Sequence, residues 1–250
     1  MADKVKLEFE LEMGEEGVRV SLAVPAGPMP ARRMLPIFQG LAGQVVEVAV
    51  TNATKSGETV SCKAGCAACC RHLVPISWTE ARQLRALVDA MPEPRRSEVR
   101  ARFAEAVDGL EAAGLLDEVR SFDTLPEKQF RSVHPRYLAL RIACPFLVDE
   151  SCSIYARRPL VCREYLVTSP AELCFDPATP QVTRIRLPTF TSLAVANLEG
   201  GGPSDSRLAL ILLFEWTDAH AGVPEVQRPA TEWIEELLQG MSRDQVPQAP

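Results

Sequence analysis

The sequence predicts an α+β fold that is mostly helical around its cysteines and carries an N-terminal β-hairpin extension. Two segments near the start alternate apolar and polar residues, as half-buried strands do. Later segments carry apolar residues at helical spacing, and one of them begins at a capping box. All eight cysteines lie between residues 62 and 174, which indicates one thiol-rich module between two cysteine-free ends.

The N-terminal elements follow from this alternation. VKLEFELE at 5–12 and VRVSLAV at 18–24 flank a short turn and predict a hairpin with one buried face. PAGPMP then breaks the chain. Residues 31–50 favour a helix that starts or is interrupted at Pro36, and the polar run 51–59 favours a loop.

Helices are predicted after the cysteine cluster. Ser77 and Glu80 have the spacing of a capping box, so a helix should run from there to about residue 91, where prolines end it. Residues 95–113 place their apolar side chains on one helical face, and Gly114 is a typical stop. A short helix is expected near 135–142.

The C-terminal third is less regular. VTRIRL at 182–187 predicts a strand, and helices are expected at 189–198 and 230–239. The apolar segment 207–220 is compatible with either a helix or a strand. The predicted organisation is an N-terminal extension at 1–58, an eight-cysteine metal-binding domain at 59–178, a C-terminal closure packed on that domain at 179–242, and a disordered tail at 243–250.

Composition and charge argue against several classes of protein. A formal net charge of −6 argues against a general binder of nucleic acid or anionic membranes. The longest fully apolar run, LALILLF at 208–214, is too short to span a bilayer, and the first residues lack the apolar core of a secretion signal. We therefore expect a cytoplasmic protein, in which clustered cysteines bind metal or perform redox chemistry.

The cysteine spacing is typical of metal ligands. It reads C-x3-C-x2-C-C, then, after a long gap, C-x7-C-x9-C-x11-C. Four thiolates complete a zinc site or a four-iron cluster, so eight can fill two such sites. The predicted ligands are Cys62, Cys66, Cys69, Cys70, Cys144, Cys152, Cys162 and Cys174. Because adjacent Cys69 and Cys70 cannot easily point the same way, we expect two sites or one polynuclear cluster.

Two roles without metal carry less weight for these cysteines. Buried free cysteine is a common core residue, which can account for one or two of the eight, Cys174 first, but not for four within nine residues. A disulfide framework would require secretion without a visible signal.

Positive charge accompanies the cysteines. Between residues 131 and 163 the sequence contains six arginines and only two acidic residues. This excess of positive charge would offset the formal charge of about −4 that two dications and eight thiolates carry. A solvated surface explains any single arginine equally well. The candidate residues around the metal are Arg71, His72, Tyr155, Arg158, Arg163 and Tyr165.

These motifs resemble one family. CKAGCAACC at 62–70, CPFL at 144–147, CSIY at 152–155 and CREY at 162–165 occur in the order found in YkgJ-type cysteine cluster proteins, a family described as a zinc- or iron-chelating domain with a CxxxCxxCC motif. The resemblance covers roughly residues 62–174 and implies metal binding by this cysteine set. Flagellin lysine N-methylases are similar in carrying such cysteines, which brings methyl transfer into consideration.

The cysteine spacing does not distinguish zinc from iron. The Cys144–Pro145 pair resembles the end of bacterial ferredoxin motifs. The chain has only three histidines, which is consistent with ligation by thiolates alone. Together these features slightly favour iron. C-x3-C-x2-C is also the spacing of radical S-adenosylmethionine enzymes. That interpretation is weaker, because Ala68 stands where those enzymes usually have an aromatic residue and the βα units of their barrel are missing downstream.

Three functions are therefore carried forward. The metal can be a chelated or structural centre in a binding or metal-handling protein. It can be an iron–sulfur centre in an enzyme of redox or group-transfer chemistry. It can also be a zinc site that stabilises a protein-interaction module.

Overall fold

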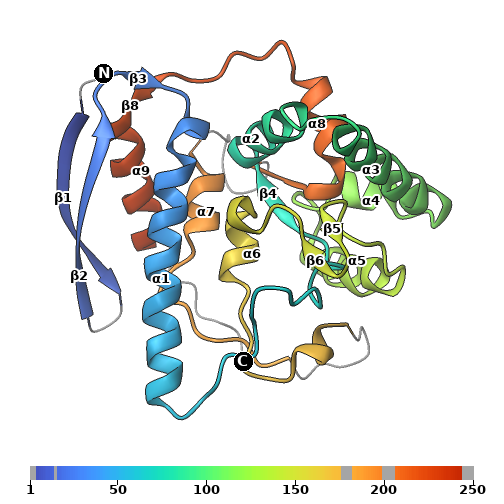
Figure 1. Ribbon diagram of the computed structural model, residues 1–250, viewed down its shortest axis with the longest axis horizontal. Coiled ribbons are helices and arrows are strands. Elements are labelled where there is room, and N and C mark those ends of the chain that lie inside the picture. The colour runs from blue at the N-terminus through green and yellow to red at the C-terminus, as the bar shows by residue number, and fades with distance from the viewer. Residues whose placement is uncertain (1–3, 14–15, 176–181, 199–205, 244–250) are drawn as a thin grey trace.

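Helices form most of the architecture, and two of the four antiparallel strand pairs among the described residues join segments that are far apart in the chain (Figure 1). The computed structural model describes residues 4–13, 16–175, 182–198 and 206–243. The predicted α+β class is confirmed, and so is the N-terminal hairpin. The predicted tail at 243–250 lies outside the described residues apart from Arg243, which ends the last helix.

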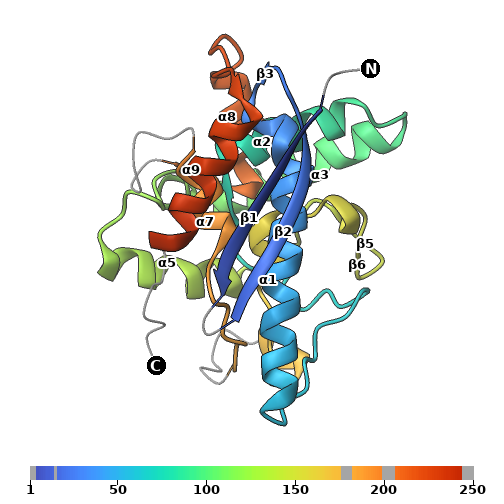
Figure 2. The same ribbon diagram turned by 90° about the vertical axis from the view of Figure 1, so that its left-hand side faces the viewer.

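The hairpin consists of β1 (Lys4–Met13) and β2 (Glu16–Pro25), paired from Lys4–Pro25 to Met13–Glu16. Side chains alternate across a strand, so Val20 and Val24 lie on the same face, and both are buried. The hairpin lies beside α1 (Leu35–Lys55) and α9 (Ala230–Arg243), as Figure 2 shows. Burial of the β2 valines therefore anchors the hairpin on the helices.

The first helical segment is longer than predicted. A 3-10 turn at Ala31–Met34 leads directly into α1, with Pro36 in its first turn, where a missing N–H costs nothing. Residues 51–59 were expected to form a loop, but α1 continues to Lys55. Ala49 and Ala53, one helical turn apart, are both buried and extend the packed face.

The same segment is notable for its length and apolar composition. Residues Ala31–Lys55 form one helix that is long and apolar enough to cross a membrane by length and composition. Core helices of soluble proteins pass the same test, and seven residues of α1 itself are buried. The apolar composition of α1 is thus used, at least in part, for packing inside the protein.

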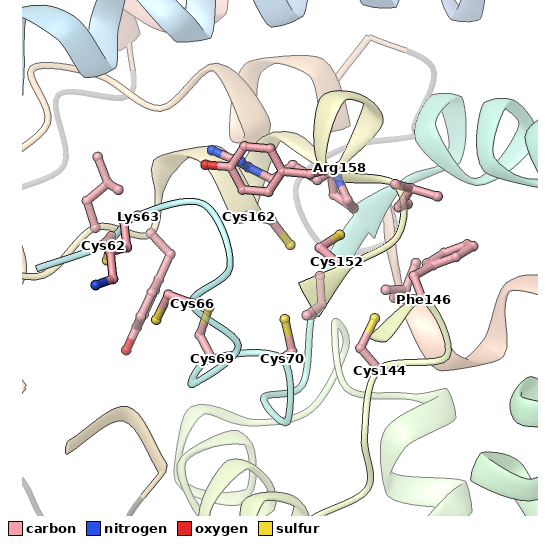
Figure 3. A pocket seen from close by; sticks show the side chains of 17 residues that line it. Cys62, Lys63, Cys66, Cys69, Cys70, Cys144, Phe146, Cys152, Arg158 and Cys162 are labelled. Atoms are coloured by element: carbon pink, nitrogen blue, oxygen red, sulfur yellow. The ribbon is translucent and has the colours of Figure 1, made fainter. Parts of the chain in front are cut away.

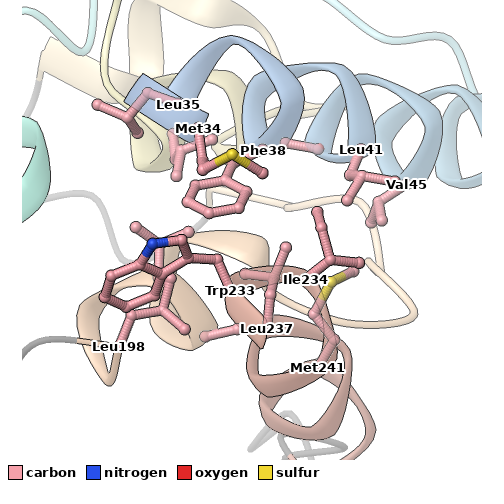
Figure 4. Close-up of a cluster of buried hydrophobic side chains, with 14 of the residues drawn as sticks. Met34, Leu35, Phe38, Leu41, Val45, Leu198, Trp233, Ile234, Leu237 and Met241 are labelled. Atoms are coloured by element: carbon pink, nitrogen blue, oxygen red, sulfur yellow. The ribbon is translucent and has the colours of Figure 1, made fainter. Parts of the chain in front are cut away.

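The largest core cluster joins the two ends of the chain. Phe38 and Leu41 of α1 face Trp233 and Leu237 of α9 (Figure 4). The indole Nε1–H of Trp233 donates to the carbonyl of Met29 at 2.8 Å, which satisfies the one polar group of this buried side chain. Strands β3 (Pro28–Met29) and β8 (Arg228–Pro229) pair beside this bond.

Helix α9 also approaches α7 (Thr191–Ala196) closely. A Cβ atom at Gly240 would lie 3.0 Å from the Cβ of Ala194, so the small residues permit the close contact. Leu160, at the start of α6 (Leu160–Glu164), lies in the same core cluster. The core of the chain ends therefore reaches the helix that carries Cys162.

A second group of helices covers the other side of the cysteine region. Helices α2 (Trp78–Asp89) and α3 (Arg95–Ala112) confirm the two predicted helices. They share a core with Phe146 and with Leu213 of α8 (Leu213–Ala219). Helix α4 spans Leu116–Arg120. Helix α5 spans Glu127–Ala139, so the helix expected near 135–142 begins and ends earlier in the chain than predicted.

The remaining strands are short. Strand β4 (Pro75–Ser77) pairs with β7 (Arg207–Ala209), and β5 (Leu147–Val148) pairs with β6 (Ser151–Cys152). The segment 207–220, for which the sequence did not distinguish helix from strand, contains β7, a 3-10 turn at Leu210–Leu212 and α8. The strand expected at 182–187 is wrong, since the backbone there forms only an isolated bridge between Val167 and Arg184.

One buried carboxylate links two helix starts. Ser77 and Glu80 form the predicted capping box, in which each side chain accepts from the other residue's backbone N–H, at 3.2 and 3.0 Å. The second oxygen of Glu80 accepts the backbone N–H of Leu160 at 2.7 Å. Glu80 is only 4% exposed. The start of α2 is therefore joined through Glu80 to the start of α6, 80 residues later.

We predict that Glu80→Ala lowers the free energy of unfolding by about 2 kcal/mol or more, because buried N–H groups of Ser77 and Leu160 lose their acceptor. Glu105→Ala is the matched control, since Glu105 lies exposed on α3, and it should change stability by less than about 0.5 kcal/mol. Urea denaturation measures both. Equal midpoints for the two variants would show that the Glu80 bonds do not support the fold.

Candidate metal centre

The segment CKAGCAACC is a chain of tight turns. Backbone N–H groups of Cys66, Cys70 and His72 donate to carbonyls three residues earlier, at 3.0 to 3.1 Å. Gly65 adopts a φ of 85°, a conformation that side chains disfavour. Because the chain turns repeatedly within this stretch, its cysteines are directed toward one region instead of along an extended line.

The later cysteines come from three further segments. Cys144 follows α5, and its N–H donates to the carbonyl of Cys70 at 2.7 Å, which ties the two cysteine motifs together. Cys152 lies in β6, after a turn in which Asp149 and Glu150 both have positive φ. Cys162 lies in α6, whose start is held by Glu80.

Seven cysteines line one cavity of about 100 Å³ (Figure 3). In Figure 3, Cys66, Cys69, Cys70 and Cys144 lie along one side of the cavity, and Cys152 and Cys162 lie on the other. None of the eight cysteines forms a disulfide. The lining cysteines are Cys62, Cys66, Cys69, Cys70, Cys144, Cys152 and Cys162.

Cys174 lies apart from the cavity lining. It belongs to a 3-10 turn at Ala171–Phe175 and is 4% exposed. It packs in a small cluster with Cys62 and Cys66, beside the buried residues Ala68 and Val167. Of the eight predicted ligands, Cys174 is therefore adjacent to one end of the cysteine group and does not face the common cavity.

The thiols are strongly desolvated. Burial raises the pKa of Cys144 to about 12 and that of Cys174 to about 11, and it raises the pKa of Cys162 well above its usual value. A negative charge on Cys69 also raises the pKa of five other thiols. These are Cys62, Cys144, Cys152, Cys162 and Cys174. Ionised thiols at this density require positive charge between them.

The donor set fits a thiophilic metal. Cysteine thiolates bind zinc and iron in proteins, and the described cysteines supply more donors than one tetrahedral ion needs. Within the residues that the structure describes, no three His, Cys, Asp or Glu side chains already converge as ligands of one ion. The sulfur atoms thus surround the cavity, and changes of cysteine rotamer must bring them onto a metal.

Arg158 supplies an unsatisfied cation at the cavity. Its Nε is buried and has no hydrogen-bond partner among the described residues. The Arg158 charge lowers the pKa of Cys62, Cys69 and Cys152, although burial and neighbouring thiols outweigh this effect. Its guanidinium lies 3.8 Å from the ring centre of Tyr155, which is 42% exposed. A negatively charged acceptor in the cavity would satisfy this buried donor.

The other arginines have different partners. Arg71 pairs with Glu150 at 2.6 Å and lies over the ring of Phe175. Arg163 donates to the carbonyls of Ala156 and Arg158, so it supports the turn before α6. Arg136, which contributed to the arginine excess, pairs with Glu118. The local excess of arginine is therefore only partly directed at the thiols.

His72 and Tyr165 both lie near Cys174. The Nε2 atom of His72 is 2.7 Å from the carbonyl of Cys174, and the rings of His72 and Tyr165 meet edge to face at 5.6 Å. Tyr165 lines the thiol cavity, and burial raises its pKa to about 12. His72 therefore ties the first cysteine loop to the turn that contains Cys174.

Two buried carboxylates that hold α6 were not predicted as part of the site. Glu80 accepts from Leu160, and Glu164 accepts the N–H and hydroxyl of Ser192 at the start of α7. The capping box made Glu80 visible in the sequence, but its second partner lies 80 residues away. No sequence signal marks Glu164.

Comparison with known proteins finds one similar family. Residues 61–179 match the family model CxxCxxCC, described as a "putative zinc- or iron-chelating domain". The matched segment contains all eight cysteines. No curated protein and no solved structure matches the chain. Residues 61–179 are therefore similar to the CxxCxxCC family, whose description is a metal-chelating one.

Proposed function

We propose that this domain holds a metal centre of more than one ion, iron in preference to zinc, through cysteine thiolates. The observation that carries the proposal is the common cavity, lined by seven cysteines from four segments. The cavity of about 100 Å³ is several times the roughly 10–15 Å³ that one water needs, which favours a polynuclear centre over a single ion. The Cys144–Pro145 pair and the few histidines favour iron.

Cys69 is proposed as the central ligand. Cys62 and Cys66 pack with Cys174 on one side, whereas Cys144 and Cys152 pack against the helical core on the other. A charge on Cys69 affects thiols of both groups. Its neighbour Cys70 is tied by its carbonyl to Cys144. The pair Cys69 and Cys70 therefore joins the two groups of ligands.

A bound metal supplies the positive charge that allows the buried thiols to ionise, and it couples ligand assembly to folding. Arg158 adds a fixed cation beside these thiolates. The orientation of α6 by Glu80 and Glu164 places Cys162 opposite the first cysteine loop. These residues prepare the cavity for the metal without binding it themselves.

We expect protein purified without oxygen to contain more than one iron per chain and to absorb near ~400 nm, as thiolate-bound iron–sulfur clusters do. Mass spectrometry of the metals and an absorption spectrum test this. Colourless protein containing zinc would overturn the assignment of iron and favour the zinc-stabilised interaction module. Protein without stoichiometric metal would overturn the proposed function.

Serine substitutions test the ligand assignment. Cys69→Ser should remove most of the metal and lower the melting temperature, because a central ligand is lost and metal binding is coupled to folding. Cys174→Ser makes the same chemical change outside the cavity lining and should retain more metal. Metal analysis and thermal melting measure both variants. If Cys69→Ser keeps full metal content, the central role of Cys69 is wrong.

Substitution of Arg158 tests the electrostatic support. Arg158→Met keeps much of the side-chain volume but removes the cation, so metal affinity should fall by about tenfold or more, as for other residues that orient metal ligands. Arg157→Met is the control, because Arg157 is exposed and does not line the cavity. Competition with a coloured chelator measures the affinities. Equal affinities would show that Arg158 does not act on the metal.

A further inference from the structure

A second cavity lies against the back of the cysteine site. It has a volume of about 440 Å³ and shares four wall residues with the thiol cavity. The shared residues are Cys69, Val74, Cys162 and Tyr165. We call this cavity the arginine pocket. Because Cys69 and Cys162 line both spaces, a molecule in the arginine pocket would lie directly beside the metal ligands.

Apart from the two cysteines that it shares with the thiol cavity, the polar residues of the arginine pocket are cationic or neutral. Arg131 and His134 come from α5, Arg184 comes from the segment that bridges to Val167, and His72 follows the first cysteine loop. Among the described residues, no aspartate or glutamate lines this pocket. Separate segments therefore converge to place positively charged side chains around this space.

Arg184 is available to a ligand. Its guanidinium lies 4.8 Å from the ring centre of Tyr165, and no carboxylate among the described residues forms an ion pair with it. The side chain is exposed, so it can move onto a ligand without breaking a buried contact. Arg184 also hydrogen-bonds the side chain of Tyr165, but a guanidinium has five N–H donors, so others can still be donated to a carboxylate or a phosphate.

The positive charge of Arg184 acts on both histidines of the arginine pocket. Their rings lie 5.1 Å apart, and the pKa of His134 is lowered to about 4 by burial first, then by the charges of His72 and Arg184. Burial disfavours any charge at this place, whereas the smaller contribution of Arg184 shows that its positive charge acts on His134. The neutral ring of His134 can still donate one hydrogen bond, whereas the neutral ring of His72 donates its N–H to the carbonyl of Cys174.

The remaining walls are apolar, which indicates that the ligand has an apolar part. They are formed by Leu73, Val74, Pro75, Pro135 and Val161. A bare inorganic anion would leave these walls unused, whereas pockets of this size typically enclose a small organic molecule held by a few polar groups. We propose that the arginine pocket binds a small organic carboxylate beside the metal centre. This inference deepens the proposed function and rests on it.

The test uses benzoate as the probe, with the neutral amide benzamide and inorganic phosphate as comparisons. Calorimetric titration of metal-loaded protein should show benzoate binding more tightly than either. Arg184→Ala should weaken benzoate binding by about tenfold or more, because a charge-assisted contact is lost. Arg186→Ala is the matched control, since Arg186 is exposed, lies two residues away and does not line the pocket.

Histidine signals give a second readout. The chain contains three histidines; His72 and His134 line the arginine pocket, and His220 lines a different cavity. In proton NMR spectra of zinc-loaded protein, benzoate should shift two of the three imidazole signals and leave the third unchanged. Arg184→Ala should reduce these shifts at the same benzoate concentration.

Several results would overturn the inference. These are no benzoate binding to metal-loaded protein, equal affinities of Arg184→Ala and wild type, or phosphate binding as tightly as benzoate, which would indicate a site for a bare anion. Metal analysis of the same samples separates the two proposals. Absence of metal overturns the proposed function, whereas metal-loaded protein that does not bind benzoate overturns the arginine pocket alone.

Discussion

The carboxylate of Glu80 is the interaction on which the arrangement of the cysteine site depends. It closes the capping box of α2 and at the same time accepts the first N–H of α6. A buried carboxylate is costly unless its oxygens are hydrogen-bonded, and here Ser77 and Leu160 provide the donors. Because α6 carries Cys162, this buried interaction determines where one wall of the thiol cavity stands. Glu164 holds the other end of α6 through Ser192, so the helix is fixed at both ends.

The chemistry of the cavity follows from its burial. Seven thiols share a small desolvated space, and their mutual repulsion as thiolates opposes ionisation. Arg158 contributes one cation, with a buried Nε that has no protein partner among the described residues. A metal contributes the remaining positive charge. The site is therefore unfavourable for free thiolates and favourable for a metal bound by them, which agrees with the match of residues 61–179 to a family model described as a "putative zinc- or iron-chelating domain".

The two cavities give Cys69 and Cys162 different surroundings on their two sides. One side faces the other thiols, and the other side faces a space with arginines, histidines and apolar walls. This arrangement distinguishes a centre that only stabilises the fold from one that meets a ligand. A structural zinc site is normally closed by its own ligands, whereas a site next to a ligand pocket can respond to what the pocket holds. The arginine pocket therefore connects metal chelation to recognition of a small molecule.

The sequence alone determined the class of the fold and the chemistry of the site. Alternation in the hairpin, the Ser77–Glu80 capping box and the spacing of CKAGCAACC are local signals, because each depends on residues within one turn or one strand pair. Two predictions were wrong because they depended on residues far away in the chain. The strand expected at 182–187 lacks a continuous partner strand. The loop expected at 51–59 is partly helix because Ala53 packs in the core. Only the tertiary structure decided that Cys174 stands outside the common cavity, that Glu80 reaches Leu160, and that Arg184 meets Tyr165 and the histidines. These contacts join residues separated by long stretches of chain, and their geometry is set by packing of the helices between them.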